Sequence, residues 1–209
     1  MALPGVRRYG LGARVYDVVS AERPVYRVGR TAAIDRLRLG PGDRVVDVGC
    51  GTGLNFPLLL DRVGPTGRVT GLDASADMLA QAARRRDAAG WRNVDLVRGD
   101  AARLAELVAG SEPYDAALFT YSLSIIDAWR EAWDQAVSLV RPGGRIGVVD
   151  LSLPGGLGAL WWPLARIACW TGGADPHREP WRAVTEDLTE VDTSTHRSGH
   201  VVAAVGTRP

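Results

Sequence analysis

The stretch Val45-Val46-Asp47-Val48-Gly49-Cys50-Gly51-Thr52-Gly53 decides how the rest of the chain is interpreted. Its first half is an apolar run typical of a buried strand, and its second half has glycine at every second position. Because glycine has no Cβ, these residues allow a sharp turn and a close approach of a ligand to the main chain. A helix is expected next, from Leu54 to about Asp61, with its first N–H groups at the turn. The stretch therefore predicts a strand, a ligand-binding turn and a helix.

The spacing of the glycines and the position of Asp47 separate two kinds of ligand. A dinucleotide-binding turn has the pattern G-x-G-x-x-G, but Leu54 occupies the place of its third glycine. The Asp47 carboxylate would repel a pyrophosphate and attract an ammonium group, directly or through water. The pattern favours a nucleoside-like ligand with a cationic end, and S-adenosylmethionine (SAM) fits that description. An NAD-dependent oxidoreductase is the alternative that both features disfavour.

Composition and charge set limits on the class of protein. A chain of 209 residues is long enough for one domain with a sizeable core. The net charge of +1 gives no reason to expect nucleic acid or an anionic membrane as the main partner. The two cysteines make no disulfide framework, and no apolar run reaches the length of a membrane span. These features predict a soluble, cytoplasmic protein.

Apolar runs and helical patterns alternate after the glycine turn, which is typical of βαβ units in a mostly parallel sheet. The predicted strands are Arg68–Leu72, Val94–Val97, Tyr114–Thr120 and Arg145–Leu151, and the predicted helices are 76–89, 101–109 and one that runs from Asp127 through Val140. Ser75 is predicted to cap the first of these helices and Gly90 to end it. Trp129 and Trp133 fall at helical spacing in the last helix, which favours a core role for both.

Two acidic residues follow predicted strands. Asp73, after the second strand, can accept hydrogen bonds from ribose hydroxyls, although NAD also carries that ribose. Asp100, after the third strand, can accept a hydrogen bond from an adenine amine while the Ala101 N–H reaches a ring nitrogen. A role for Asp100 as a helix N-cap is compatible with this. Met78 can pack on the adenine face or belong to the core.

The D-x-G-x-G-x-G pattern and the run Leu139-Val140-Arg141-Pro142-Gly143-Gly144-Arg145 resemble motifs of class I SAM-dependent methyltransferases, and this resemblance extends from Gly42 to Leu151. It implies an α/β, Rossmann-like fold with a seven-stranded, mostly parallel sheet, a C-terminal antiparallel strand, an N-terminal helical cap and a helical insertion after strand 5. The resemblance implies SAM as cofactor and the following binding residues: Tyr16, Arg30, Asp47, Gly49, Cys50, Gly51, Gly53, Asn55, Asp73, Ala74, Met78, Asp100, Ala101, Thr120, Tyr121 and Ser122.

The expected domain is single and divides into a helical cap (1–40), a SAM-binding core (42–151), a Trp-rich insertion (152–189) and a terminal hairpin (190–209). Helices are predicted at Leu11–Ala21 and Val25–Leu39, either as a cover on the sheet or as a cap that closes over the cofactor. The hairpin is predicted to pair Glu190–Thr195 with His200–Val205.

The insertion contains Trp161, Trp162 and Trp170, whose apolar area is too large to leave in water. They are expected to pack on the domain, to cover an apolar acceptor, or to form the face of a homodimer. The layout of this region also resembles small bacterial methyltransferases of the lipid-headgroup and quinone type, which implies an apolar, lipid-like or secondary-metabolite acceptor.

Methyl transfer from SAM disperses charge, so orientation and desolvation supply most of the catalysis. Tyr121 and His177 are the candidate catalytic residues, because a hydroxyl acceptor needs a base. No set of acidic residues can be placed as a divalent-metal site. A SAM-binding protein of the same fold that catalyses another reaction, such as a cyclisation, or acts in regulation remains a competing hypothesis.

Overall fold

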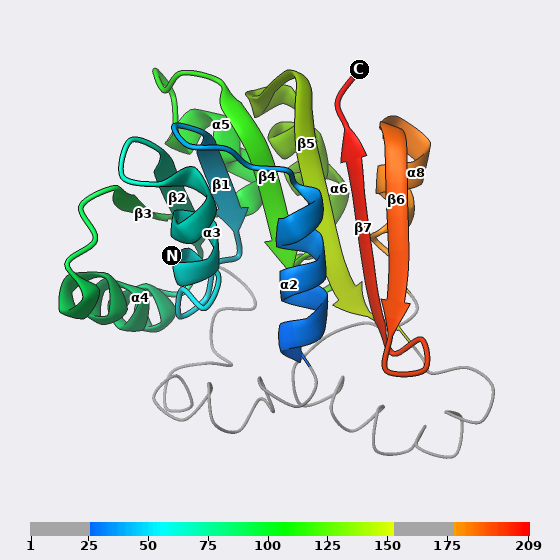
Figure 1. Cartoon of the computed structure of the whole chain (residues 1–209), viewed down its shortest axis with the longest axis horizontal. Coiled ribbons are helices and arrows are strands. Elements are labelled where there is room, and N and C mark those ends of the chain that lie inside the picture. Colours follow the sequence, from blue (N-terminus) through cyan, green and yellow to red (C-terminus); the bar gives the residue numbers. More distant parts are fainter. Residues whose placement is uncertain (1–25, 153–177) are drawn as a thin grey trace.

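The computed structural model describes residues 26–152 and 178–209, and these residues build one seven-stranded sheet (Figure 1). The strand order is β3-β2-β1-β4-β5-β7-β6, and β7 alone among the described strands runs in the direction opposite to the others. The predicted Rossmann-like α/β fold with a C-terminal antiparallel strand is confirmed. The strands are β1 (Arg44–Val48), β2 (Arg68–Asp73), β3 (Val94–Arg98), β4 (Tyr114–Thr120), β5 (Val140–Leu151), β6 (Thr189–His196) and β7 (Val201–Thr207).

Helices cover both faces of the sheet (Figure 1). One face packs against α2 (Arg27–Arg36), α3 (Phe56–Val63) and α4 (Ala76–Ala89). The opposite face packs against α5 (Leu104–Leu107), α6 (Trp129–Leu139) and α8 (Arg182–Asp187). Because successive side chains of a strand point to opposite faces, each strand supplies both cores. Val45 packs under α2 and α3, whereas Val46 packs on the other side.

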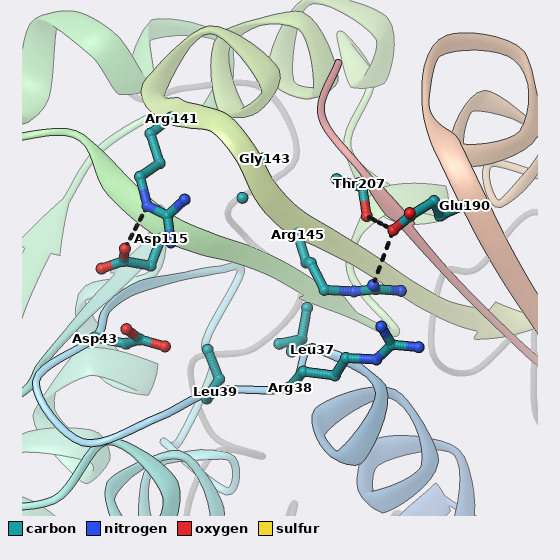
Figure 2. Close-up of a pocket in the computed structure, with 11 residues that line it drawn as sticks. Leu37, Arg38, Leu39, Asp43, Asp115, Arg141, Gly143, Arg145, Glu190 and Thr207 are labelled. Carbon is teal, nitrogen blue, oxygen red and sulfur yellow. Dashed lines mark hydrogen bonds and ion pairs between the residues drawn. The ribbon is translucent and has the colours of Figure 1, made fainter.

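The strand β5 begins earlier than the sequence predicts. The expected helix through Val140 ends at Leu139, and the predicted break at 141–144 belongs to the strand. Val140 pairs with Tyr114, and a register shift before Ala116 accommodates the Pro-Gly-Gly segment. Arg141 Nε donates to Asp115 Oδ1 at 2.7 Å, which ties the segment to β4 (Figure 2). Contacts between neighbouring strands therefore override the local helical pattern.

Two other boundaries also differ from the expectation. The predicted helix over 101–109 is a 3-10 turn, η3 (Ala101–Arg103), followed by the four-residue α5. The terminal hairpin begins at Thr189, and its turn places Arg197, Ser198 and Gly199 at positive φ. The predicted hairpin itself is confirmed, because β6 and β7 pair antiparallel.

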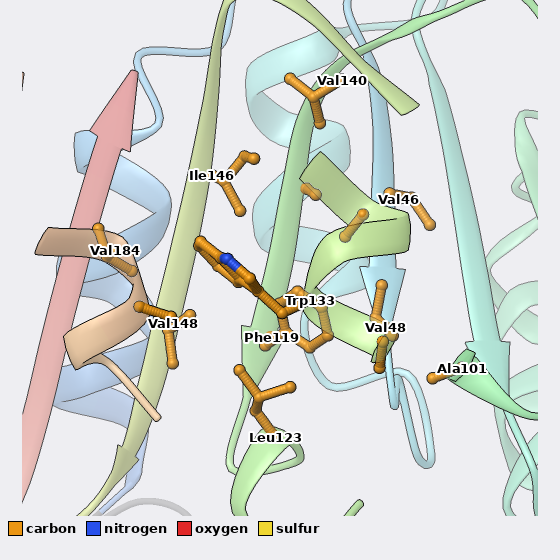
Figure 3. Close-up of a cluster of buried hydrophobic side chains, with 14 of the residues drawn as sticks. Val46, Val48, Ala101, Phe119, Leu123, Trp133, Val140, Ile146, Val148 and Val184 are labelled. Carbon is orange, nitrogen blue, oxygen red and sulfur yellow. The ribbon is translucent and has the colours of Figure 1, made fainter. Parts of the chain in front are cut away.

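Trp133 is the largest fully buried side chain of the core beneath α6 (Figure 3). Its ring centroid lies 6.2 Å from that of Phe119, and its Nε1 donates to Asp187 Oδ2 at 2.7 Å. Burial of a tryptophan stabilises the fold by about 4–6 kcal/mol as an upper value. The predicted core role of Trp133 is confirmed, and Trp129 is partly buried against the same cluster.

Several predicted features lie outside the described residues. They are the helix Leu11–Ala21 with Tyr16, and the tryptophans 161, 162 and 170 with His177. Within the ranges 26–152 and 178–209, no helix has both the length and the apolar character needed to cross a membrane.

Candidate functional site

The alternation of side chains along β1 and β4 directs two polar groups to one place. Val45, Ala116 and Leu118 pack on the face covered by α2 and α3, so Asp47 and Thr120 point to that face as well. Both residues stand at or next to the carboxyl ends of neighbouring parallel strands. Ligands of open α/β sheets bind at this edge, where the strand order reverses.

A buried hydrogen-bond network joins these strand ends to the helices above them. Asn55 is its centre: its Nδ2 donates to Asp47 Oδ1 at 2.8 Å and to Thr120 Oγ1 at 2.9 Å. Arg30 Nη1 donates to Asn55 Oδ1 at 2.6 Å and to Thr120 Oγ1 at 3.1 Å. The Arg30 guanidinium also stands over the Tyr121 ring, 5.7 Å from its centroid. Residues of α2, the end of β1, the start of α3 and the end of β4 thus form one polar cluster.

Asp47 is the electrostatic feature of this cluster. Its side chain is fully buried, and its Oδ2 has no hydrogen-bond partner among the described residues. Burial raises its pKa to about 7, although Asn55 and Arg30 act in the opposite direction. A buried carboxylate oxygen without a partner is costly, so a cationic group placed against it would be bound strongly.

The glycine turn has the shape that the sequence predicts, because Gly49, Gly51 and Gly53 have φ of 73°, 55° and 77°. A Cβ at Gly49 would stand 2.4 Å from the Ser122 Cβ, and one at Gly53 would meet the Phe56 ring. A Cβ at Gly51 would meet no atom within 4 Å. The turn is therefore packed against the protein at its two ends and open in the middle.

Asp73 fastens the open part of the turn to β2. Its Oδ2 accepts from the Gly51 N–H at 2.8 Å, and its Oδ1 accepts from the Ser75 N–H at 2.8 Å. Burial raises the pKa of Asp73, while these backbone donors favour its ionised form. Ser75 caps α4 by accepting from the Met78 N–H, as predicted, and Met78 is buried. Each carboxylate oxygen keeps a second lone pair for a ligand hydroxyl.

The remaining candidates of the predicted set flank this edge of the sheet. Asp100 is an N-cap, as predicted, because its Oδ1 accepts from the Ala102 N–H at 3.0 Å. Ala101 is buried, and Ala74, which directly follows β2, is half-buried. Cys50 is a buried free thiol in the core under α3, and burial raises its pKa. Cys50 is thus a small core residue with little thiolate character.

Tyr121 occupies a strained position directly after β4, with φ of 56°. Its hydroxyl donates to the Tyr26 carbonyl at 2.7 Å, and the two rings lie 4.8 Å apart. Left-handed non-glycine residues cluster at ligand sites, since the surrounding structure must hold them. Its neighbour Ser122 donates from Oγ to the Val48 carbonyl at 2.8 Å. The Tyr121 phenol therefore links β4 to the start of α2.

A second buried carboxylate was missed by sequence reasoning. Asp150, near the end of β5, accepts from Ser124 Oγ at 2.7 Å and from the Ser124 N–H at 2.9 Å. Burial raises its pKa to about 6. Arg178 donates to the Ser124 and Ile126 carbonyls. The available signal was the repeated Val-Val-Asp at 45–47 and 148–150. Residues 150 and 178 therefore meet at the loop after β4.

The part of the chain that the structure describes holds no group of three or more His, Cys, Asp or Glu side chains suited to a metal ion. A family model described as a methyltransferase domain matches residues 45–144, which contain the glycine turn, Asp73 and Asp100. This match covers just under half of the chain, and it supports the resemblance to class I SAM-dependent methyltransferases.

Similar proteins agree with this assignment. The chain is 29% identical over 125 residues to the demethylmenaquinone methyltransferase of Listeria welshimeri, which covers 60% of this chain and 52% of that protein. The same enzyme of Bacillus cytotoxicus is 29% identical over 138 residues, covering 66% of this chain and 56% of the relative. The match thus spans about half the length of these curated relatives.

Among solved structures, the phosphoethanolamine N-methyltransferase 2 of Haemonchus contortus in complex with SAM matches with a TM-score of 0.72 at 12% identity. The match covers 97% of this chain and 58% of that one. This likeness concerns the fold and not the acceptor.

Proposed function

We propose that this chain is an enzyme that transfers a methyl group from SAM to a small apolar acceptor. The observation that carries the proposal is Asp47, a fully buried carboxylate with an unpartnered Oδ2 within the described residues, next to a glycine turn that is open at Gly51. A ligand with an ammonium group and a nucleoside fits this arrangement. NAD does not fit it, because its pyrophosphate would meet the Asp47 charge.

The residues at the sheet edge divide the recognition of SAM between them. Asp47 pairs with the ammonium group, Arg30 and Asn55 hold the Asp47 carboxylate and orient it, and Asp73 accepts from the ribose hydroxyls. Asp100 accepts from the adenine amine while the Ala101 N–H donates to the ring. Bound SAM supplies an electrophilic methyl group on a sulfonium.

The remaining predicted contacts belong to the walls of the same site. Ala74 and Met78 flank the adenine, Gly49, Cys50 and Gly53 shape the turn, and Thr120, Tyr121 and Ser122 line the side from which the acceptor enters. Tyr16 in the cap (1–40) is assigned to the methionine end. This set is a proposal that residue-by-residue substitution will test.

The acceptor is proposed to bind at the loop that follows β4, beside Tyr121. The chain's relatives are named for demethylmenaquinone, so an aromatic, quinone-like ring with an apolar tail is the first acceptor to test. Tyr121 and His177 are the groups proposed to orient the acceptor or take its proton. Orientation and exclusion of water supply the rest of the rate.

The proposal is tested by turnover of methyl-labelled SAM with the purified full chain. The acceptor panel contains a demethylated naphthoquinol, phosphoethanolamine and a phenol without a tail. We expect label in the naphthoquinol product and none in an Asp73→Asn variant at the same SAM concentration. Tight binding of SAM without transfer to any acceptor would instead favour a SAM-binding role without methyl transfer. Binding of NAD and not SAM would overturn both.

A further inference from the structure

The opposite edge of the sheet, where the parallel strands begin, has a pocket of its own (Figure 2). Its volume is about 270 Å³, and its wall is built from the end of α2, the start of β5, the first residues of β6 and the end of β7. Ligand sites of this size take small molecules or parts of larger ones. It lies at the other end of the strands from Asp47, so it is separate from the SAM site.

Arg145 enters this pocket because of its register in β5. Ile146 packs under α6, so Arg145 and Gly147 face α2. A Cβ at Gly147 would contact Leu37, and Arg145 lines the pocket together with Leu37 and Arg38. Only 9% of that side chain is exposed, although it is a guanidinium. A buried arginine is costly unless acceptors surround it.

Arg145 has too few hydrogen-bond acceptors around it to satisfy its guanidinium N–H groups. Its Nε has no hydrogen-bond partner in residues 26–152 and 178–209. Its single ion pair, to Glu190 Oε2, is long at 3.9 Å, and Glu190 is 71% exposed. That same Oε2 already accepts from Thr207 Oγ1 at 3.1 Å. The guanidinium therefore faces the pocket with unused donors.

A second guanidinium stands next to it. Arg38 lines the same pocket, is exposed, and makes no ion pair or side-chain hydrogen bond within the described segments. Figure 2 shows the two guanidinium groups side by side. Burial and the charge of Arg38 both lower the pKa of Arg145. Like charges are held together at this edge, so an anion between them would be stabilised by both.

The acidic residues of the pocket do not supply the anion between the Arg38 and Arg145 guanidinium groups. Asp115 is engaged by Arg141 Nε at 2.7 Å and by the Arg44 N–H at 2.8 Å. Asp43 accepts from the Gly40 N–H at 2.8 Å. Among the described residues, Glu190 is the acid of the pocket that pairs with Arg145, and the charge of Asp192 also acts on that guanidinium. The exposure of Glu190 lets its side chain turn into water when another anion binds.

We propose that Arg38 and Arg145 form a binding site for a phosphoryl group carried by a small soluble molecule. Two adjacent guanidinium forks match the oxygens of a dianion better than those of a single carboxylate. Glu190 is a weak internal competitor that leaves Arg145 when the phosphoryl group binds. Since the pocket lies away from the SAM edge, the ligand is an effector or an anchor and not the methyl acceptor.

The test is a calorimetric titration of the full chain with inorganic phosphate and with glycerol 3-phosphate, at constant ionic strength. We expect saturable binding at one site. Arg38→Asn should weaken it about tenfold or more, because one charge-assisted contact is lost. Asn tolerates the left-handed backbone of Arg38, whose φ is 53°, so this variant should fold. Glu190→Gln should tighten binding, and Arg84→Gln, on the exposed side of α4, should leave it unchanged.

Three results would overturn the proposal. The first is the absence of saturable binding of either phosphate compound. The second is an equal loss in Arg84→Gln and Arg38→Asn, which would mean general screening of charge. The third is binding only to phosphatidylcholine vesicles that contain phosphatidic acid, which would assign the arginines to a membrane surface. Each result is independent of methyl transfer, so failure here leaves the proposed enzyme activity untouched.

Discussion

Replacement of Asp47 by Asn should stabilise the protein without ligand and weaken its binding of SAM. Burial raises the pKa of Asp47 from 3.8 to about 7, which corresponds to a cost of about 4 kcal/mol for the ionised form. Asn removes that charge and can still accept from Asn55. The amide NH2 of Asn would stand where Asp47 Oδ2 stands, and that atom has no partner in the described segments. Burying this unsatisfied donor costs about 1–3 kcal/mol. The expected net gain at pH 8 is about 1–3 kcal/mol.

The sign of this effect depends on pH. Because the folded-state pKa of Asp47 exceeds the unfolded one, the folded protein holds the extra proton between pH 3.8 and about 7. The free energy of unfolding of the wild type therefore falls as pH rises through that window. Asp47→Asn lacks this dependence, so it should be the more stable protein at pH 8 and lose its advantage at pH 5. Urea denaturation at both values of pH measures the difference.

Binding of SAM should change in the opposite direction. The ammonium group favours ionised Asp47, so the wild-type Kd should fall as pH rises towards about 7 and then level off. Asp47→Asn should bind SAM at least tenfold more weakly at pH 8, with no such pH dependence. 5′-Methylthioadenosine, which lacks the ammonium group, is the matched control and should bind both proteins alike. Equal loss of affinity for both ligands, or a variant less stable than wild type at pH 8, would refute the reasoning.

Four further substitutions test the glycine turn, the core and the charge network around Asp47. Gly49→Ala should destabilise the fold by more than about 2 kcal/mol, because its Cβ would stand 2.4 Å from the Ser122 Cβ. Gly51→Ala should cost only about 1–2 kcal/mol, because its only penalty is the positive φ. Thermal unfolding of the two variants measures the difference. Trp133→Ala should cost about 3–5 kcal/mol in urea denaturation, and a loss below 1 kcal/mol would contradict its place in the core. Arg30→Ala removes a positive charge that lowers the pKa of Asp47, so the midpoint of the pH dependence of SAM binding should move to higher pH. An unchanged midpoint would mean that Arg30 does not affect the ionisation of Asp47.

The fold was predictable because its signals are local and repeated. The glycine turn, the Ser75 cap and the stop at Gly90 each depend on residues next to one another, and the structure has all three. The early start of β5 was not predictable, since Val140 joins the sheet through Tyr114 and Arg141 through Asp115. Those partners are distant in the sequence, and they outweigh the helical spacing.

Some residues of the candidate site were predictable from the sequence, and others were not. Asp47, Asp73 and Asp100 end strands, so the sequence alone brings them to one edge. The link from Arg30 through Asn55 to Thr120 depends on how α2 lies on the sheet, which no local pattern reveals. Asp150 has the same Val-Val-Asp signal as Asp47, yet it points to the opposite face because of its register. The pair of Arg38 and Arg145 likewise exists only in the folded chain.

The most direct test of the account is a calorimetric titration of the full chain with SAM and, separately, with NAD at pH 8. We predict saturable binding of SAM at one site, no binding of NAD, and loss of SAM binding in Asp73→Asn, because that carboxylate holds the turn and is proposed to accept from the ribose hydroxyls. Saturable binding of NAD, or SAM binding that survives both Asp47→Asn and Asp73→Asn unchanged, would contradict it.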